Sequence, residues 1–141
     1  VMKGYLNNPQ ATAQTLDDEG WLHTGDIAII DEHDHMTVVD RLKELIKYKG
    51  FQVPPAELEG LLATHPKIID VAVIGVADEE AGELPKAFVV PAPGQQVTLE
   101  EVQAYLNDHV ASYKQIRILE MRESIPKSAS GKILRRDLRD A

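Results

Sequence analysis

Apolar residues recur at helical spacing in two segments of the chain. In residues 58–62, leucines occupy positions i, i+3 and i+4 and so share one side of a helix. The prolines at 54–55 suit its first turn, and the His-Pro pair at 65–66 ends it. In residues 99–110, four apolar residues again share one side, and residues 98–101 form a capping box before them. Both segments therefore predict amphipathic helices.

Runs rich in β-branched residues predict the strands. Residues 27–39 are typical of a hairpin whose polar connection is 31–35. Residues 45–53 predict a second, short hairpin, in which Gly50 takes a positive φ at the turn without a Cβ penalty. Three further runs predict strands at 68–76, 86–91 and 117–121.

Helices and strands alternate, so the pattern predicts a mixed α/β (α+β) fold rather than a bundle or a sandwich. We expect a small domain with a central three-stranded sheet flanked by helices, plus the short hairpin, and a basic helix from about Lys132. Residues 1–20 are rich in turn formers and are interpreted as irregular. Residues 1–40 are poor in helix signals, β-rich and different in charge from the residues that follow, which places a domain boundary near 40–43.

Composition narrows the functional classes. The chain has 141 residues, no cysteine and a net charge of −8, which argues against disulfides, thiolate chemistry and general nucleic-acid binding. Its longest apolar run, near 71–76, is far shorter than the roughly 20 residues of a membrane span. We expect no membrane span, no nucleic-acid partner and a cytoplasmic location.

Two basic islands interrupt an acidic chain. Residues 41–53 carry a net charge of +3 and residues 111–141 carry +4, while the two remaining segments carry −7 and −8. The islands are either solvated surface or two faces that meet a phosphate-bearing ligand.

Local motifs leave the chemistry open. Asp26, after Thr-Gly, could accept two ribose hydroxyls or cap a turn. Gly131-Lys132 does not complete a phosphate-binding loop, because Pro126 and Ile133 replace its glycine and its hydroxyl residue. What remains is a lysine on a Ser/Gly-rich loop that could neutralise a phosphate. The histidines at 33 and 35 are typical of a polar turn more than of a metal site.

The order and spacing of four motifs are more specific. They are WLHTGD at 21–26, DRLKELIKYKGFQV at 40–53, PAELE at 55–59 and PKSASGK at 126–132. This set resembles the C-terminal part of the adenylate-forming enzymes: acyl-CoA synthetases, 4-coumarate:CoA ligases and beetle luciferases. The resemblance runs through essentially the whole chain. It implies that 1–40 is the tail of a large N-terminal domain, 41–43 a hinge and 44–141 a mobile C-terminal domain.

The resemblance also implies roles in a first, adenylating step, in which ATP activates a carboxylic acid. Asp26 is expected to bind the ribose hydroxyls of ATP or AMP, and Arg41 to support the ribose and phosphate. Lys132 is expected to contact the carboxylate and the α-phosphate, and Lys43 to be the hinge. Related peptide-synthetase domains usually carry Asp at the hinge position, so Lys43 favours the CoA-ligase and luciferase branch.

After a rotation of the small domain, the family transfers the acyl group to CoA. By resemblance, Lys47 and Gln52 on the short hairpin then face the site as catalytic residues. Lys49 and Gly50 are expected to lie along the CoA tunnel.

The resemblance leaves much of the enzyme outside this chain. The ATP loop, the acyl pocket and the Mg²⁺ that accompanies ATP belong to the N-terminal domain, and no metal site is expected here. The identity of the carboxylic acid is not encoded in these residues. The interpretation as a CoA-ligase fragment, inactive alone, competes with a stand-alone binding module and with a luciferase-like oxygenase.

Overall fold

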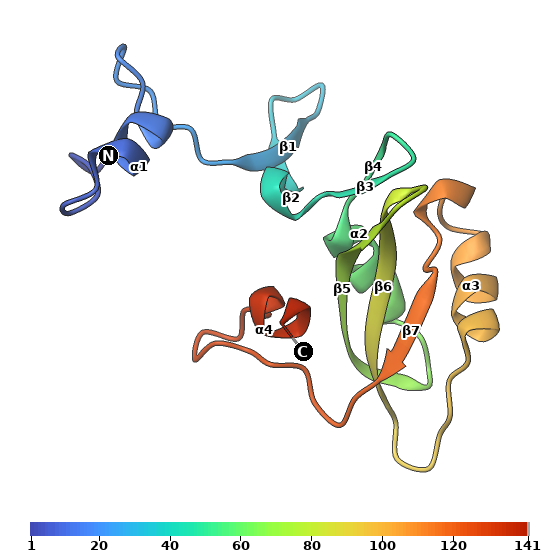
Figure 1. Cartoon of the computed structure of the whole chain (residues 1–141). Coiled ribbons are helices and arrows are strands. Elements are labelled where there is room, and N and C mark those ends of the chain that lie inside the picture. Colours follow the sequence, from blue (N-terminus) through green and yellow to red (C-terminus); the bar gives the residue numbers. More distant parts are fainter. Residues whose placement is uncertain (141) are drawn as a thin grey trace.

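The computed structural model describes residues 1–140. An N-terminal part carries α1 (Pro9–Thr15) and the antiparallel hairpin of β1 (Asp26–Ile30) and β2 (Met36–Arg41). Figure 1 shows this part standing beside a compact α/β domain, which the chain enters through the 3₁₀ turn Leu42–Glu44. No helix in the described residues is long and apolar enough to cross a membrane.

One mixed sheet forms the centre of the α/β domain. Its strands follow the order β4-β3-β6-β5, with β7 pairing parallel to β6. Their bounds are β3 Ile46–Tyr48, β4 Phe51–Val53, β5 Ile68–Asp78, β6 Gly82–Pro91 and β7 Ile118–Met121. The predicted α/β class is confirmed, but the short hairpin is part of the sheet, which has five strands rather than three. β6 pairs with β3 at its first residue, where Gly82 lies opposite Tyr48, and it pairs with β7 only from Lys86 onward.

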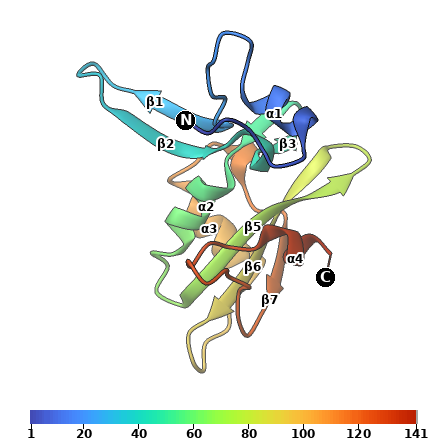
Figure 2. The ribbon, with the colours of Figure 1, turned by 90° about the vertical axis from the view of Figure 1, so that its left-hand side faces the viewer.

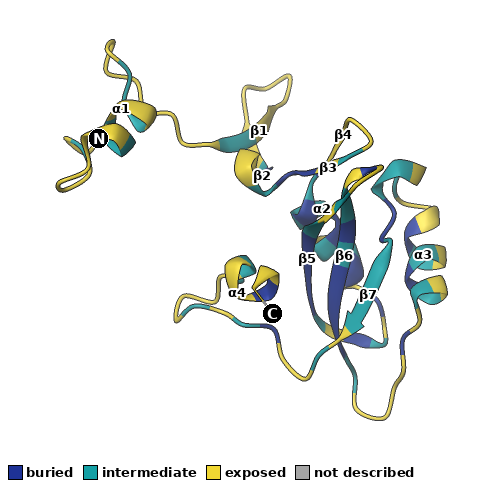
Figure 3. Cartoon of the chain, in the orientation of Figure 1, coloured by how far each residue is buried: buried dark blue, intermediate teal, exposed yellow. Residues whose placement is uncertain are grey.

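Both faces of this sheet are covered. α2 (Pro55–Leu62) and α3 (Leu99–Asn107) bury their leucines and valines against one face, with Val73 and Val89 among the strand residues. The C-terminal segment covers the other face and buries Ile125 and Leu138 against Ala72, Ile74 and Phe88. Figure 2 shows α4 (Arg135–Arg139) in front of the sheet and α2 and α3 behind it, and Figure 3 shows the buried strands between them. Burial on both sides explains the unbroken apolar run of β5.

Local signals of different strength explain where the sequence prediction succeeded and where it failed. The helices at α2 and α3 and both hairpins are confirmed. α1 was predicted as irregular because none of its residues is buried, so it has no apolar periodicity. The signal that could have found it is Asn8-Pro9, an N-cap whose side chain accepts from Ala11 N. The basic helix begins at Arg135 rather than Lys132, because Lys127 and Ile133 form a bridge that keeps 127–133 in a turn.

The capping box of α3 gives a direct test of the fold. Thr98 Oγ1 accepts from Glu101 N at 3.2 Å, and Glu101 Oε2 accepts from Thr98 N at 3.0 Å. We expect Thr98→Ala to lower the free energy of unfolding by about 1 kcal/mol, because one helix amide loses its acceptor. Urea unfolding of the chain measures the loss, with Thr37→Ala, an exposed threonine on β2, as the matched control. Equal stability of Thr98→Ala and the parent chain would contradict the assignment.

The same cap predicts acid sensitivity. Hydrogen bonds from Lys67 and then from the Thr98 amide lower the pKa of Glu101 below its ordinary value. A carboxyl whose pKa is lowered by folding stabilises the fold above its unfolded value, and the contribution disappears as the pH falls through the folded value. The difference between parent and Glu101→Gln should therefore shrink below about pH 4 in urea titrations at several pH values.

Candidate functional site

The strands β1 and β2 bring Asp26 and Arg41 together. These residues are cross-strand partners at the open end of the hairpin, and Arg41 Nε lies 2.9 Å from Asp26 Oδ1. Thr24 Oγ1 accepts from Asp26 N at 3.1 Å, and Gly25 accepts from Leu42 N at 2.8 Å. The carboxylate is half-buried on a cavity of about 550 Å³ that Arg41 also lines. Asp26 thus keeps an acceptor oxygen beside a fixed cation.

Lys132 reaches the same neighbourhood from the other end of the chain. It directly follows the 128–131 loop, where Ser128 N donates to Lys132 O at 2.8 Å and Ser128 Oγ accepts from Lys132 N at 3.2 Å. Gly131 has φ +80°, a conformation that glycine adopts freely. Lys132, Arg41 and Lys43 line one cavity of about 480 Å³. Arg41 borders both cavities, so Asp26 lines the cavity on one side of it, and Lys43 and Lys132 line the cavity on the other. The predicted adenylation set thus draws on both sides of the predicted domain boundary.

The four residues predicted for the second step lie elsewhere. Lys47 and Gln52 are cross-strand partners on β3 and β4, and Lys49 and Gly50 form the turn between them with φ of +49° and +82°. All four are exposed, and they line neither cavity described above. A side chain of β6 holds this hairpin: Glu83 Oε2 accepts from Lys47 N at 2.7 Å. The structure therefore separates this set from Lys132 and Arg41.

Two carboxylates that were not predicted from the sequence line the 480 Å³ cavity. Asp40 is buried, and its Oδ2 accepts from Ala56 N at 3.0 Å, which caps α2 across the predicted hinge. The signal was Pro54, an N-cap that offers no side-chain acceptor and so requires one from elsewhere. Glu59 forms an ion pair with Arg135 at 2.7 Å. Burial raises the pKa of Glu59 above its ordinary value, against the opposing effects of the Val73 amide and Arg135.

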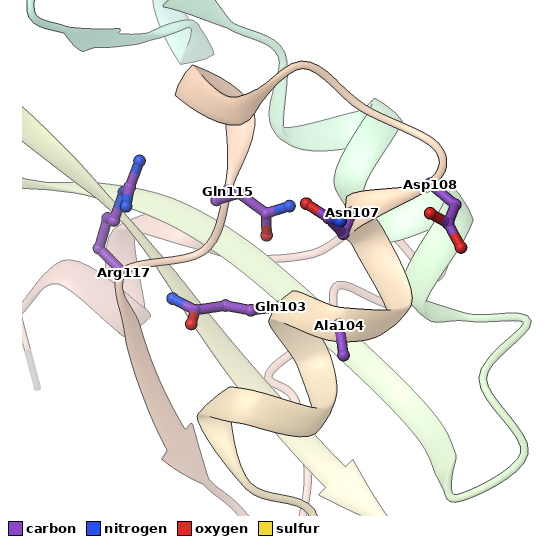
Figure 4. Close-up of a pocket in the computed structure, with 6 residues that line it drawn as sticks. All are labelled: Gln103, Ala104, Asn107, Asp108, Gln115 and Arg117. Carbon is purple, nitrogen blue, oxygen red and sulfur yellow. The ribbon is translucent and has the colours of Figure 1, made fainter.

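A third cavity lies on the far side of the domain. Figure 4 shows its lining from α3 and from the segment before β7, and its volume is about 400 Å³. Gln103 Nε2 donates to Ile116 O at 2.7 Å, whereas the buried Gln115 Oε1 has no hydrogen-bond partner in the described residues. No residue predicted for a function lines this cavity.

The histidines of the first hairpin behave as turn residues. Asp31 Oδ1 accepts from the backbone amides of His33 and His35 at 2.8 and 2.9 Å. These bonds lower the pKa of Asp31. Within residues 1–140, no group of three or more His, Cys, Asp or Glu side chains is arranged to hold a metal ion.

The fold and the sequence motifs define a class of protein. Residues 57–132 match the family described as the AMP-binding enzyme C-terminal domain, and the chain belongs to this family. The 4-coumarate--CoA ligase of Vanilla planifolia is 60% identical over 139 residues, and the 4-coumarate-CoA ligase 1 of Narcissus pseudonarcissus is 57% identical. Each alignment covers 99% of this chain but 25% of the relative, so the chain spans about a quarter of these relatives' length.

Solved structures of the family differ in how closely they match. ATP-bound MatB from Rhodopseudomonas palustris has a TM-score of 0.90 at 31% identity, over 99% of this chain and 28% of that one. MenE from Bacillus subtilis in complex with an acyl-adenylate intermediate has a TM-score of 0.89 at 34% identity, over 100% and 28%. The apo form of MatB has a TM-score of only 0.71 at the same identity and coverage as the ATP-bound form. At equal identity and coverage, the ATP-bound form of MatB therefore superposes on this chain better than the apo form does.

Proposed function

We propose that this chain is the C-terminal part of an ATP-dependent acyl- or aryl-CoA ligase, and that its arrangement corresponds to the adenylating state. The observation that carries the proposal is the convergence of Asp26, Arg41 and Lys132 on two cavities joined at Arg41. The higher TM-score against ATP-bound MatB than against apo MatB supports the same state. The 57% and 60% identities to 4-coumarate–CoA ligases support the branch.

In the proposed adenylation, each residue has a physical task. Asp26 accepts the ribose hydroxyls, because a carboxylate offers paired acceptors and Arg41 holds its orientation. The Lys132 ammonium offsets the negative charge that develops at the α-phosphorus when the carboxylate attacks and pyrophosphate leaves. Mg²⁺ would enter with ATP and be held by the N-terminal domain.

In the proposed second step, the small domain rotates about Lys43. The hairpin then presents Lys47 and Gln52 to the acyl-adenylate, while the CoA thiol attacks and AMP leaves. Lys49 and Gly50 border the CoA, and Gly50 lets the backbone approach it closely because it has no side chain. We place the enzyme in the cytoplasm, and its carboxylic acid substrate is selected by the N-terminal domain.

A graft tests the proposal directly. We define the grafted ligase as the Vanilla planifolia 4-coumarate–CoA ligase with its matched C-terminal segment replaced by this chain. It is expected to release pyrophosphate with ATP and 4-coumarate and to form the CoA thioester. The same ligase without any C-terminal segment is the control. A folded grafted ligase that is no more active than this control would contradict the proposal and favour a stand-alone binding module.

The isolated chain gives a complementary prediction. It should bind ATP weakly and make no acyl-adenylate, because Asp26, Arg41 and Lys132 are present without an ATP loop. Calorimetry measures the binding, with Asp26→Ala as the control variant, and pyrophosphate release measures turnover. Steady turnover by the isolated chain would overturn its interpretation as a fragment.

A further inference from the structure

An ion pair closes the outer edge of β5 at a single residue. β5 is an edge strand of the sheet, so the outward peptide groups of Val73 have no partner strand. Val73 N donates to Glu59 Oε1 at 2.8 Å, and Val73 O accepts from Arg135 Nε at 3.4 Å. Arg135 Nη2 then donates to both oxygens of Glu59, at 2.8 and 2.7 Å. The pair therefore joins α2, β5 and α4 through the backbone of one residue, Val73.

This pair is more enclosed than its neighbours. The side chains of Arg135 and Glu59 are only 18% and 13% exposed. Two further ion pairs hold the same C-terminal segment, Lys127–Asp70 at 2.7 Å and Arg139–Glu44 at 2.8 Å. Their arginine and lysine partners are 42% and 38% exposed, so solvent screens them more. The Glu59–Arg135 pair is thus the least exposed of the three ion pairs that hold the C-terminal segment.

The pair lies beside the lysine loop. Arg135 follows Lys132 by three residues, and both line the 480 Å³ cavity together with Glu59. Between them, Ile133 packs against the sheet. The Glu59–Arg135 pair therefore holds one end of the short segment 132–135 in place. Lys132 is the residue at the other end of this segment.

We propose that Glu59 and Arg135 are positioning residues for Lys132, and that they govern the adenylating half-reaction and not the thioester-forming one. The assignment rests on the proposed function, because it takes Lys132 to be the lysine of adenylation. Lys47 and Gln52, which serve the other half-reaction, are held by different contacts on the β3–β4 hairpin. A defect in the pair should therefore separate the two steps.

The test uses Arg135→Lys and Glu59→Gln in the grafted ligase. Lysine keeps the charge but loses the planar fork that spans Glu59 and Val73, and glutamine keeps the shape but loses the charge. We expect adenylation, measured by pyrophosphate release, to fall about 10- to 100-fold, since a small displacement of a catalytic group has such an effect. Thioester formation from supplied coumaroyl-adenylate should stay close to that of the parent graft.

Two matched controls lie on the same elements. Arg136 is exposed and lies 3.8 Å from Asp140, and Glu57 forms an ion pair with Lys114 away from the cavity. Arg136→Lys and Glu57→Gln should leave both half-reactions near those of the parent. Losses in these controls as large as in Arg135→Lys would overturn the assignment.

A double variant distinguishes positioning from general stability. If Arg135 acts through Lys132, then Lys132→Ala with Arg135→Lys should adenylate no more slowly than Lys132→Ala alone. Multiplied losses, or equal losses of both half-reactions in Arg135→Lys, would overturn the proposal and indicate a structural role. A grafted ligase that forms no adenylate with both residues intact would instead overturn the proposed function, and this assignment with it.

Discussion

Replacement of Lys132 by alanine in the grafted ligase is expected to lower adenylation by about 10²–10³, or about 3–4 kcal/mol, which is typical for the loss of one charge-stabilising donor. Within residues 1–140, no carboxylate forms an ion pair with the Lys132 ammonium, so its charge is available to a ligand. Its backbone is meanwhile held by Ser128. The Lys132 ammonium is therefore available to a ligand, while the backbone of this residue is held in place.

Thioester formation from supplied acyl-adenylate should be largely spared in Lys132→Ala. The residues proposed for that step, Lys47 and Gln52, lie on a separate exposed hairpin. Single-turnover measurements of each half-reaction provide the comparison, and Arg136→Ala, which removes an exposed cation of the same C-terminal segment, is the matched control. Equal losses in both half-reactions would count against a step-specific role.

Replacement of Lys43 by proline is expected to have the reverse effect. Lys43 is the middle residue of the 3₁₀ turn Leu42–Glu44, where φ is near the value that proline imposes and the first amides have no helical acceptor. Proline also disfavours the helical conformation of the preceding Leu42, which lies in the same turn, so we expect the variant to keep this arrangement at some cost in stability. A hinge must absorb a large change in φ and ψ over few residues, which proline at this position opposes.

We therefore expect Lys43→Pro to form acyl-adenylate while thioester formation falls by about 10² or more, because Lys47 and Gln52 would remain outside the site. The two half-reactions are measured separately, and Lys43→Ala is the control that removes the amine without restricting the backbone. A proline variant that makes thioester at the parent rate would show that residue 43 is not the pivot.

The structure adds a contact that bears on the proposed hinge. Asp40 precedes Lys43, yet its carboxylate caps α2, which follows it. A rotation at Lys43 that carries α2 away from β2 would break this hydrogen bond. The contact therefore belongs to the arrangement described here, which matches ATP-bound MatB more closely than apo MatB.

Sequence alone determined the features that depend on near neighbours. α2 and α3 were predicted from apolar spacing, the cap of α3 from residues 98–101, and the β3–β4 turn from Gly50. The order and spacing of the motifs also indicated the family to which the chain belongs. Such signals are readable because helix periodicity, caps and tight turns are properties of a few consecutive residues.

Only the tertiary structure decided which distant residues meet. The joining of the short hairpin to the sheet at Gly82 and the approach of Lys132 to Arg41 leave no local pattern. Glu59 and Arg135 lie 76 positions apart and meet because α2 and the C-terminal segment both pack against β5. Their partnership depends on burial and on an unpaired strand edge, and these arise only when the sheet has formed.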